Sequence, residues 1–139
     1  MDFSEASTLA AEAEELLGKL LEEAVGLLRN FDTSSPESLE ETICRRGDIL
    51  ERFLDLESRL AVLEERAKGD ELIRFKALRE SREALVGRIQ ETDSLVIALA
   101  HEQLSVIKGD LAALVKGKRA LNAYEGSASV RSHAVNDSA

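Results

Sequence analysis

Proline, cysteine, aromatic side chains and long apolar runs are all scarce in this chain of 139 residues. It has one proline, one cysteine and no tryptophan, and aromatic residues make up 4%. The single cysteine, Cys44, excludes an internal disulfide, and the lack of about 18 consecutive apolar residues excludes a membrane-spanning helix. The acidic first residues lack the cationic start of a signal peptide. These features together favour a reducing cytosol, with no membrane as partner.

Positive charge is also in short supply. The chain has 27 acidic and 18 basic residues, which give a formal charge of −9. A surface of this sign repels nucleic acid unless cations gather on one face. The one notable basic cluster is Lys116, Lys118 and Arg119, near an expected helix end where cations oppose the helix dipole. We therefore expect no nucleic-acid partner.

Catalytic and metal-binding constellations are missing as well. His101 and His133 have no Cys, Asp or Glu residues at metal-ligand spacing around them. The many paired glutamates, such as Glu64 and Glu65, are typical of solvated helix faces. Cys44 lies beside an apolar stripe and is expected to be a small, partly buried hydrophobe. We expect no catalytic residue, cofactor or metal, and therefore a protein that is not an enzyme.

Strong helix formers dominate what is present, since charged residues alone reach 32% and Ala and Leu are abundant. Such a composition with helical periodicity is typical of packed long helices. The pattern predicts an all-α, coiled-coil-like antiparallel bundle of three long helices, with an extended third helix. The helices are expected at about 2–31, 36–68 and 70–124, so that 1–124 forms the bundle and 125–139 a disordered tail.

The ends of the first two helices have recognisable signals. Asp2 and Glu5 have capping-box spacing, and Ser35 followed by Pro36 is a typical helix start. Gly69 suits a left-handed turn, after which Asp70 can cap the third helix. Apolar residues at heptad-like spacing predict the core. In the first helix they are Ala13, Leu17, Leu20, Ala24, Leu27 and Phe31, broadened by Leu16, Leu21 and Leu28; in the second, Leu39, Ile43, Ile49, Phe53, Leu56, Leu60 and Leu63; in the third, Leu72, Phe75, Leu78, Leu85, Ile89, Val96 and Leu99.

A further apolar stripe follows late in the third helix. Short turns make neighbouring helices antiparallel, so that residues after about Gln103 should extend beyond the bundle for roughly 30 Å. The C-terminal stripe consists of Leu104, Ile107, Leu111, Leu114 and Leu121. No other segment is expected to cover it, and an exposed apolar stripe usually marks an interaction surface. The alternatives are that the helix bends back on the bundle, with Gly109 or Gly117 as break points, or that the stripe pairs with a second copy.

The end of this helix carries the one recognisable motif. A leucine-rich stretch from Leu111 runs into a Lys-Gly-Lys block at 116–118 and ends in the pair Ala123 and Tyr124. This order resembles the terminal signature of the FliT-type flagellar export chaperones, and the related FlgN-type chaperones have a similar size and layout. Residues 89–97 resemble the family's Asp-containing stretch, here with Asp93. The chain departs from some FliT-type proteins in ending with a Ser-, Ala- and Asn-rich tail instead of a fourth helix.

The resemblance, closer to the FliT type, implies a cytosolic chaperone of type III flagellar export. Such chaperones bind late structural subunits, either the filament-cap protein or the hook–filament junction proteins, and deliver them to the export gate. The family's tyrosine at the end of the last long helix, here Tyr124, contributes to docking on the gate's cytosolic platform. From the residues alone, Tyr124 could instead close the helix end by packing on Leu121. The competing hypothesis for the whole chain is a homodimeric coiled-coil scaffold without a role in export.

Overall fold

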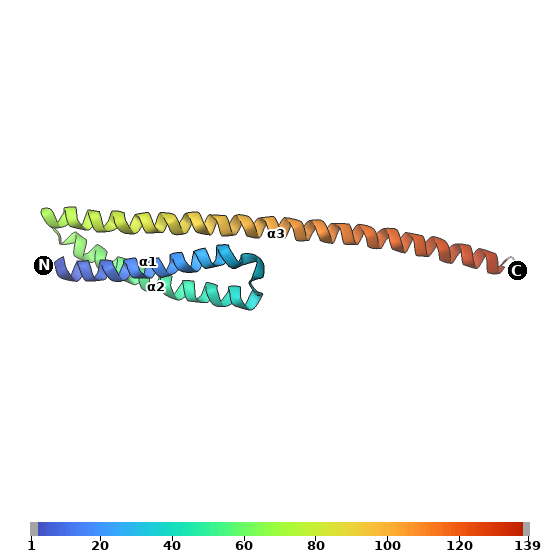
Figure 1. The fold of residues 1–139 in the computed structure, drawn as a ribbon, viewed down its shortest axis with the longest axis horizontal. Coiled ribbons are helices and arrows are strands. Elements are labelled where there is room, and N and C mark those ends of the chain that lie inside the picture. The colour runs from blue at the N-terminus through green and yellow to red at the C-terminus, as the bar shows by residue number, and fades with distance from the viewer. Residues whose placement is uncertain (1–2, 138–139) are drawn as a thin grey trace. The chain divides into compact units, whose positions relative to one another are not determined.

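Residues 3–137 form three α-helices joined by short turns (Figure 1). The computed structural model describes residues 3–137 and, within them, the side chains of residues 3–126. Helix α1 spans Phe3–Asn30 and is followed by the 3-10 turn η1 at Phe31–Thr33; α2 spans Pro36–Glu65, and α3 spans Asp70–Asp137. The predicted all-α fold of three long helices is thus confirmed. By its contacts the chain divides into two compact units, Met1–Leu99 and Ala100–Ala139.

The helix boundaries follow from local chemistry. The hydroxyl of Ser35 accepts a hydrogen bond from the Ser38 amide at 3.1 Å, and Pro36 occupies the first turn, as predicted for the start of α2. Gly69 has φ +63°, a backbone conformation that disfavours side chains with a Cβ atom. α2 ends at Glu65, before the predicted Lys68, and α3 includes Asp70 as its first residue. The predicted cap at Asp2 lies outside the described residues.

Two predictions about the third helix are settled by its length. α3 is a single helix through Gly109 and Gly117, so neither glycine breaks it. It also continues past Tyr124 to Asp137, whereas the sequence predicted a disordered tail from Glu125; that boundary was wrong. The prediction relied on missing apolar periodicity, but no proline follows Pro36, and serine and alanine are tolerated in a solvated helix. Residues 138 and 139 lie outside the described residues.

The core of the first unit lies between α1, α2 and the first part of α3, which run side by side in Figure 1. All predicted core residues except Ile43 and Leu72 are buried or half-buried, and Leu17 is only 2% exposed. The Phe3 and Phe75 rings meet edge to face at 5.3 Å, and the Arg74 guanidinium lies 5.4 Å from the centre of the Phe3 ring. These contacts hold the start of α1 against the start of α3.

Three predicted buried positions were wrong. Ile43 is 66% exposed, Leu72 is exposed, and Cys44 is exposed instead of partly buried. On α2 the neighbouring Thr42 takes the inward position, where its hydroxyl donates to the Ser38 carbonyl at 3.0 Å. A threonine whose hydroxyl bonds its own helix can occupy a core position at little cost. Burial therefore follows the angular position on the helix more closely than the hydropathy of the residue.

Ion pairs between helices set the register of the first unit. The Arg46 guanidinium contacts the Asp93 carboxylate at 2.7 Å, and Arg82 Nε donates to Glu57 Oε1 at 2.5 Å. Both pairs join α2 to α3 at the levels expected for antiparallel helices connected through Gly69, and Arg79 pairs with Glu64 nearer the turn. On the other side of α2, Arg45 Nε donates to Glu23 of α1 at 3.0 Å. This hydrogen bond raises the pKa of Arg45 above its ordinary value.

Arg82 gives a stability prediction, because it is a cation in an apolar core stripe. It lies one turn from Leu78 and Leu85 and is only 6% exposed. Glu57→Ala leaves this guanidinium without its acceptor and should destabilise the unit by about 1–3 kcal/mol in urea unfolding. Arg82→Leu removes the buried charge and keeps the side-chain volume, so its stability should equal or exceed that of the parent. A larger loss for Arg82→Leu than for Glu57→Ala would contradict this account.

Candidate functional site

The predicted C-terminal stripe lies entirely within the second unit and is exposed along its whole length. Gln103 is half-buried, and every described side chain from Leu104 to Gly126 is exposed. Leu114 is the most exposed member of the stripe at 68%, and the other members, Leu104, Ile107, Leu111 and Leu121, are each about half exposed. Neither α1 nor α2 contributes a residue to this unit, so the stripe is an apolar helix face that the second unit leaves uncovered.

The stripe has a hollow beside it. Its lining residues follow one another at helical spacing and are Asp110, Ala113, Leu114, Gly117, Lys118 and Leu121. It is a shallow depression open to solvent, since all of its lining residues come from α3 and are exposed. Gly117 has no side chain to fill it, and a Cβ atom added there would meet nothing within 4 Å. From the sequence, Gly117 was predicted only as a point where the helix could break, so this feature was missed.

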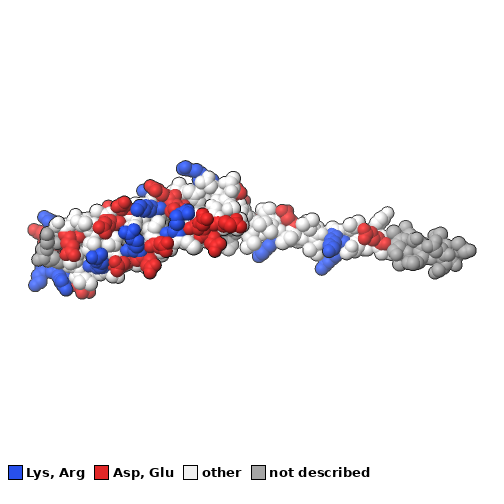
Figure 2. Space-filling model, turned by 90° about the horizontal axis from the view of Figure 1, so that it is seen from below, with Lys and Arg blue, Asp and Glu red and all other residues white. Residues whose placement is uncertain are grey.

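Charged side chains are distributed differently on the first and second units. In Figure 2 acidic and basic side chains crowd the visible face of the first unit, while uncharged surface predominates on that of the second. Between Gln103 and Leu121 the sequence has four cations, Lys108, Lys116, Lys118 and Arg119, against one carboxylate, Asp110. Because the chain as a whole has a charge of −9, this short cationic segment differs in sign from the rest of the protein.

Tyr124 follows the stripe and is 73% exposed. Such exposure leaves little of the ring to pack on Leu121, which was the structural alternative for this residue. An exposed tyrosine offers both an apolar ring and a hydroxyl to a partner, a combination that is enriched at interfaces. Its position is compatible with docking, and the docking itself stays a prediction.

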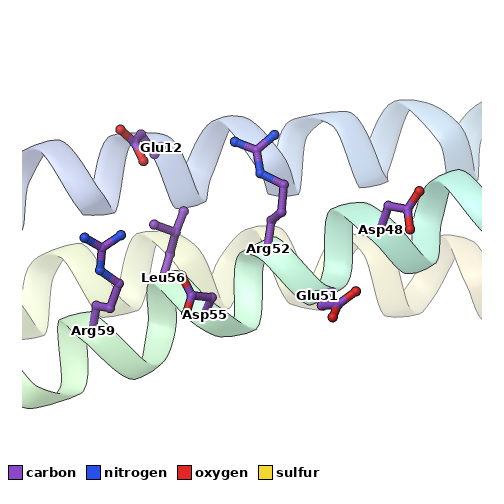
Figure 3. Close-up of a pocket in the computed structure, with 7 residues that line it drawn as sticks. All are labelled: Glu12, Asp48, Glu51, Arg52, Asp55, Leu56 and Arg59. Carbon is purple, nitrogen blue, oxygen red and sulfur yellow. The ribbon is translucent and has the colours of Figure 1, made fainter.

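A second groove lies in the first unit between α1 and α2, with a volume of about 560 Å³. Figure 3 shows Arg52 and Arg59 extending from α2 toward α1, from which Glu12 projects. The other lining residues are Asp48, Glu51, Asp55 and Leu56. Charges of both signs alternate along it, and none of its lining residues is a histidine, serine or cysteine. The groove resembles an ordinary solvated helix junction more than a catalytic site.

The remaining chemically notable residues stand apart from one another. His101 is exposed on α3, and the side chain of His133 lies outside those that the structure describes. Asp93, in the stretch 89–97, forms an ion pair with Arg46 that joins α3 to α2. This contact gives Asp93 a role in helix packing. Within residues 3–126, we find no cluster of three or more His, Cys, Asp or Glu side chains arranged to hold a metal ion.

Two findings bear on the chain as a whole. Of the helices in the described part of the chain, none has a stretch long and apolar enough to cross a bilayer. Comparison of the chain with protein-family models, with curated proteins and with solved structures gave no match.

Proposed function

We propose that this protein is a cytosolic chaperone of type III flagellar export, closer to the FliT type than to the FlgN type. It would bind a late structural subunit, the filament-cap protein or a hook–filament junction protein, and deliver it to the export gate. The observation that supports a binding role best is the C-terminal stripe, a run of half-exposed leucine and isoleucine side chains on one helix face. The flagellar pathway is supported only by the motif from Leu111 to Tyr124.

Client binding on this surface is a helix-in-groove interaction. A partner's amphipathic helix lies along α3 with its apolar face on Leu104, Ile107, Leu111 and Leu114. Burial of each such side chain contributes about 1.5–3 kcal/mol, from which the ordering of a flexible client subtracts a few kcal/mol. The balance corresponds to micromolar affinity, which suits a chaperone that must release its cargo. Leu121 extends the surface toward Tyr124, which docks on the cytosolic platform of the gate.

In this proposal the protein binds and delivers, and performs no chemistry. The side chains that define the surface are aliphatic, and the charged groups around it are lysines, one arginine, Asp110 and Glu125. They provide no nucleophile paired with a base, which covalent catalysis requires. The proposal therefore includes neither a cofactor nor an enzymatic activity.

Co-elution tests the function directly. The purified protein is mixed with the filament-cap protein and, separately, with each hook–filament junction protein, then analysed by size exclusion with light scattering. A stoichiometric complex with the cap protein supports the FliT-type assignment, and one with a junction protein supports the FlgN type. If no subunit binds and the protein elutes as a stable dimer, the homodimeric scaffold replaces this proposal.

A further inference from the structure

The charges around the C-terminal stripe restrict what can cover it. Lys118 lies one turn after Leu114 and one turn before Leu121, within the stripe itself. Lys108 and Arg119 flank the stripe on one side. Asp110 is the one carboxylate between Leu104 and Leu121, and Glu125 follows one turn after Leu121. Lysine can lay its aliphatic stem along an apolar face and present its ammonium at the edge. A helix packed here would therefore have cations beside its flanking positions.

The hollow beside the stripe restricts the partner's shape. In packed helices each large side chain enters a hole formed by four residues at positions i, i+3, i+4 and i+7 of the facing helix. Leu114, Gly117, Lys118 and Leu121 have this spacing and all line the hollow. With glycine at one corner, the hole is deeper than one formed by four side chains. It suits a large aliphatic side chain such as leucine.

A second copy of the chain fits this surface poorly. In an antiparallel two-fold dimer the same edge of each stripe faces its counterpart, so Lys108 and Arg119, which lie on one edge, would approach the same cations of the other copy. Like charges facing each other across an interface lower affinity and select against that partner. The charge balance therefore favours an acidic occupant over self-pairing.

We propose that the C-terminal stripe selects an amphipathic helix with large aliphatic side chains on one face and carboxylates at the flanking positions. One aliphatic side chain of that helix enters the notch, which we define as the hole formed by Leu114, Gly117, Lys118 and Leu121. The glutamates or aspartates of the partner pair with Lys108, Lys118 and Arg119. This inference rests on the client-binding role proposed above and specifies which segment of a client is bound.

Two synthetic peptides test the charge selection. Both have three heptads with leucine at positions a and d, and they differ only in having glutamate or lysine at positions e and g. Fluorescence anisotropy with the full chain should show the glutamate peptide binding at least about tenfold more tightly, with the preference shrinking at high salt. Lys108→Glu with Arg119→Glu should reverse the preference. Lys116→Glu, a single charge reversal on the opposite side of the helix from the stripe, should leave the preference unchanged.

A second pair of variants tests the notch. Gly117→Leu fills it and should weaken the glutamate peptide about tenfold, as overpacking does. Gly109→Leu makes the same change on the face opposite the stripe, where an added Cβ also meets nothing within 4 Å, and should bind like the parent. Equal binding of both peptides, no binding of either, or an unaltered affinity in Gly117→Leu would overturn the inference. So would a dimer of the parent that the glutamate peptide dissociates, because a second copy would then be the natural occupant.

These outcomes are separable from those of the co-elution experiment. If a flagellar subunit co-elutes with the parent and with all the variants equally, the proposed function stands and the inference fails. If no flagellar subunit binds but the glutamate peptide shows the expected ranking, the selectivity of the surface stands and the flagellar assignment fails.

Discussion

Replacing Ile107 and Leu111 together by alanine will weaken client binding by about 100-fold. Each truncation removes roughly 1.5 kcal/mol of apolar burial in the complex, and the two together correspond to about two orders of magnitude in Kd. The helix itself should persist, because both side chains are exposed and alanine is the strongest helix former. Isothermal titration with the subunit that co-elutes measures the affinity, and far-UV circular dichroism measures the helicity.

The matched control for this variant is Ile73→Ala combined with Leu95→Ala. These two residues are also exposed and also belong to α3, but they lie in the first unit and outside the stripe. They remove the same residue types and should leave the affinity unchanged. If both double variants weaken binding equally, the stripe is no more important than any other exposed apolar surface. Undiminished binding by the Ile107 and Leu111 variant would remove the stripe from the mechanism.

Leu17→Ala will have the largest effect on stability, at about 3 kcal/mol. Leu17 is 2% exposed and is surrounded by Ala13, Leu20 and other buried residues of the first unit. A cavity left by a truncated core leucine costs both the lost transfer free energy and the lost contacts. For a chain of this size, the loss corresponds to a decrease in Tm of roughly 10 °C. Differential scanning calorimetry measures it.

Leu54→Ala is the control for the core variant. Leu54 is exposed on α2, so its truncation should change the free energy of unfolding by less than about 0.5 kcal/mol. Client binding to the C-terminal stripe should be unaltered in either variant at temperatures where the first unit is folded, because the stripe lies in the second unit. If Leu17→Ala and Leu54→Ala lost similar amounts of stability, the assignment of Leu17 to the core and of Leu54 to the surface would be contradicted.

Local chemistry made the helix boundaries of the first unit predictable. The hydroxyl of Ser35, the ring of Pro36 and the absent Cβ of Gly69 each act within one turn of the backbone. Such signals need no knowledge of distant residues. The far end of α3 was mispredicted because it has no such local signal, neither a proline nor a capping residue. The predicted boundary at Glu125 relied on apolar patterning alone.

Apolar periodicity predicted the core residues less accurately than local signals predicted the helix boundaries. It placed Leu17, Phe53 and Phe75 correctly, because each lies in the middle of a broad apolar face. It failed at Ile43, where the adjacent Thr42 takes the inward position, and at Leu72, which is exposed in the first turn of α3. Arg82 was missed altogether. A charged residue in a heptad position is counted as a surface residue until its partner, here Glu57 on another helix, is known.

At the candidate site, helical spacing alone places Leu104, Ile107, Leu111, Leu114 and Leu121 on one face, because residues at i, i+3, i+4 and i+7 share a helix face whatever surrounds them. The excess of cations beside them also follows from the sequence alone. The exposure of this face and the notch beside Gly117 became visible only in the folded chain. The exposed fraction of a side chain depends on which other atoms of the chain lie against it. Packing between helices decides this, and the order of residues along the chain does not specify that packing.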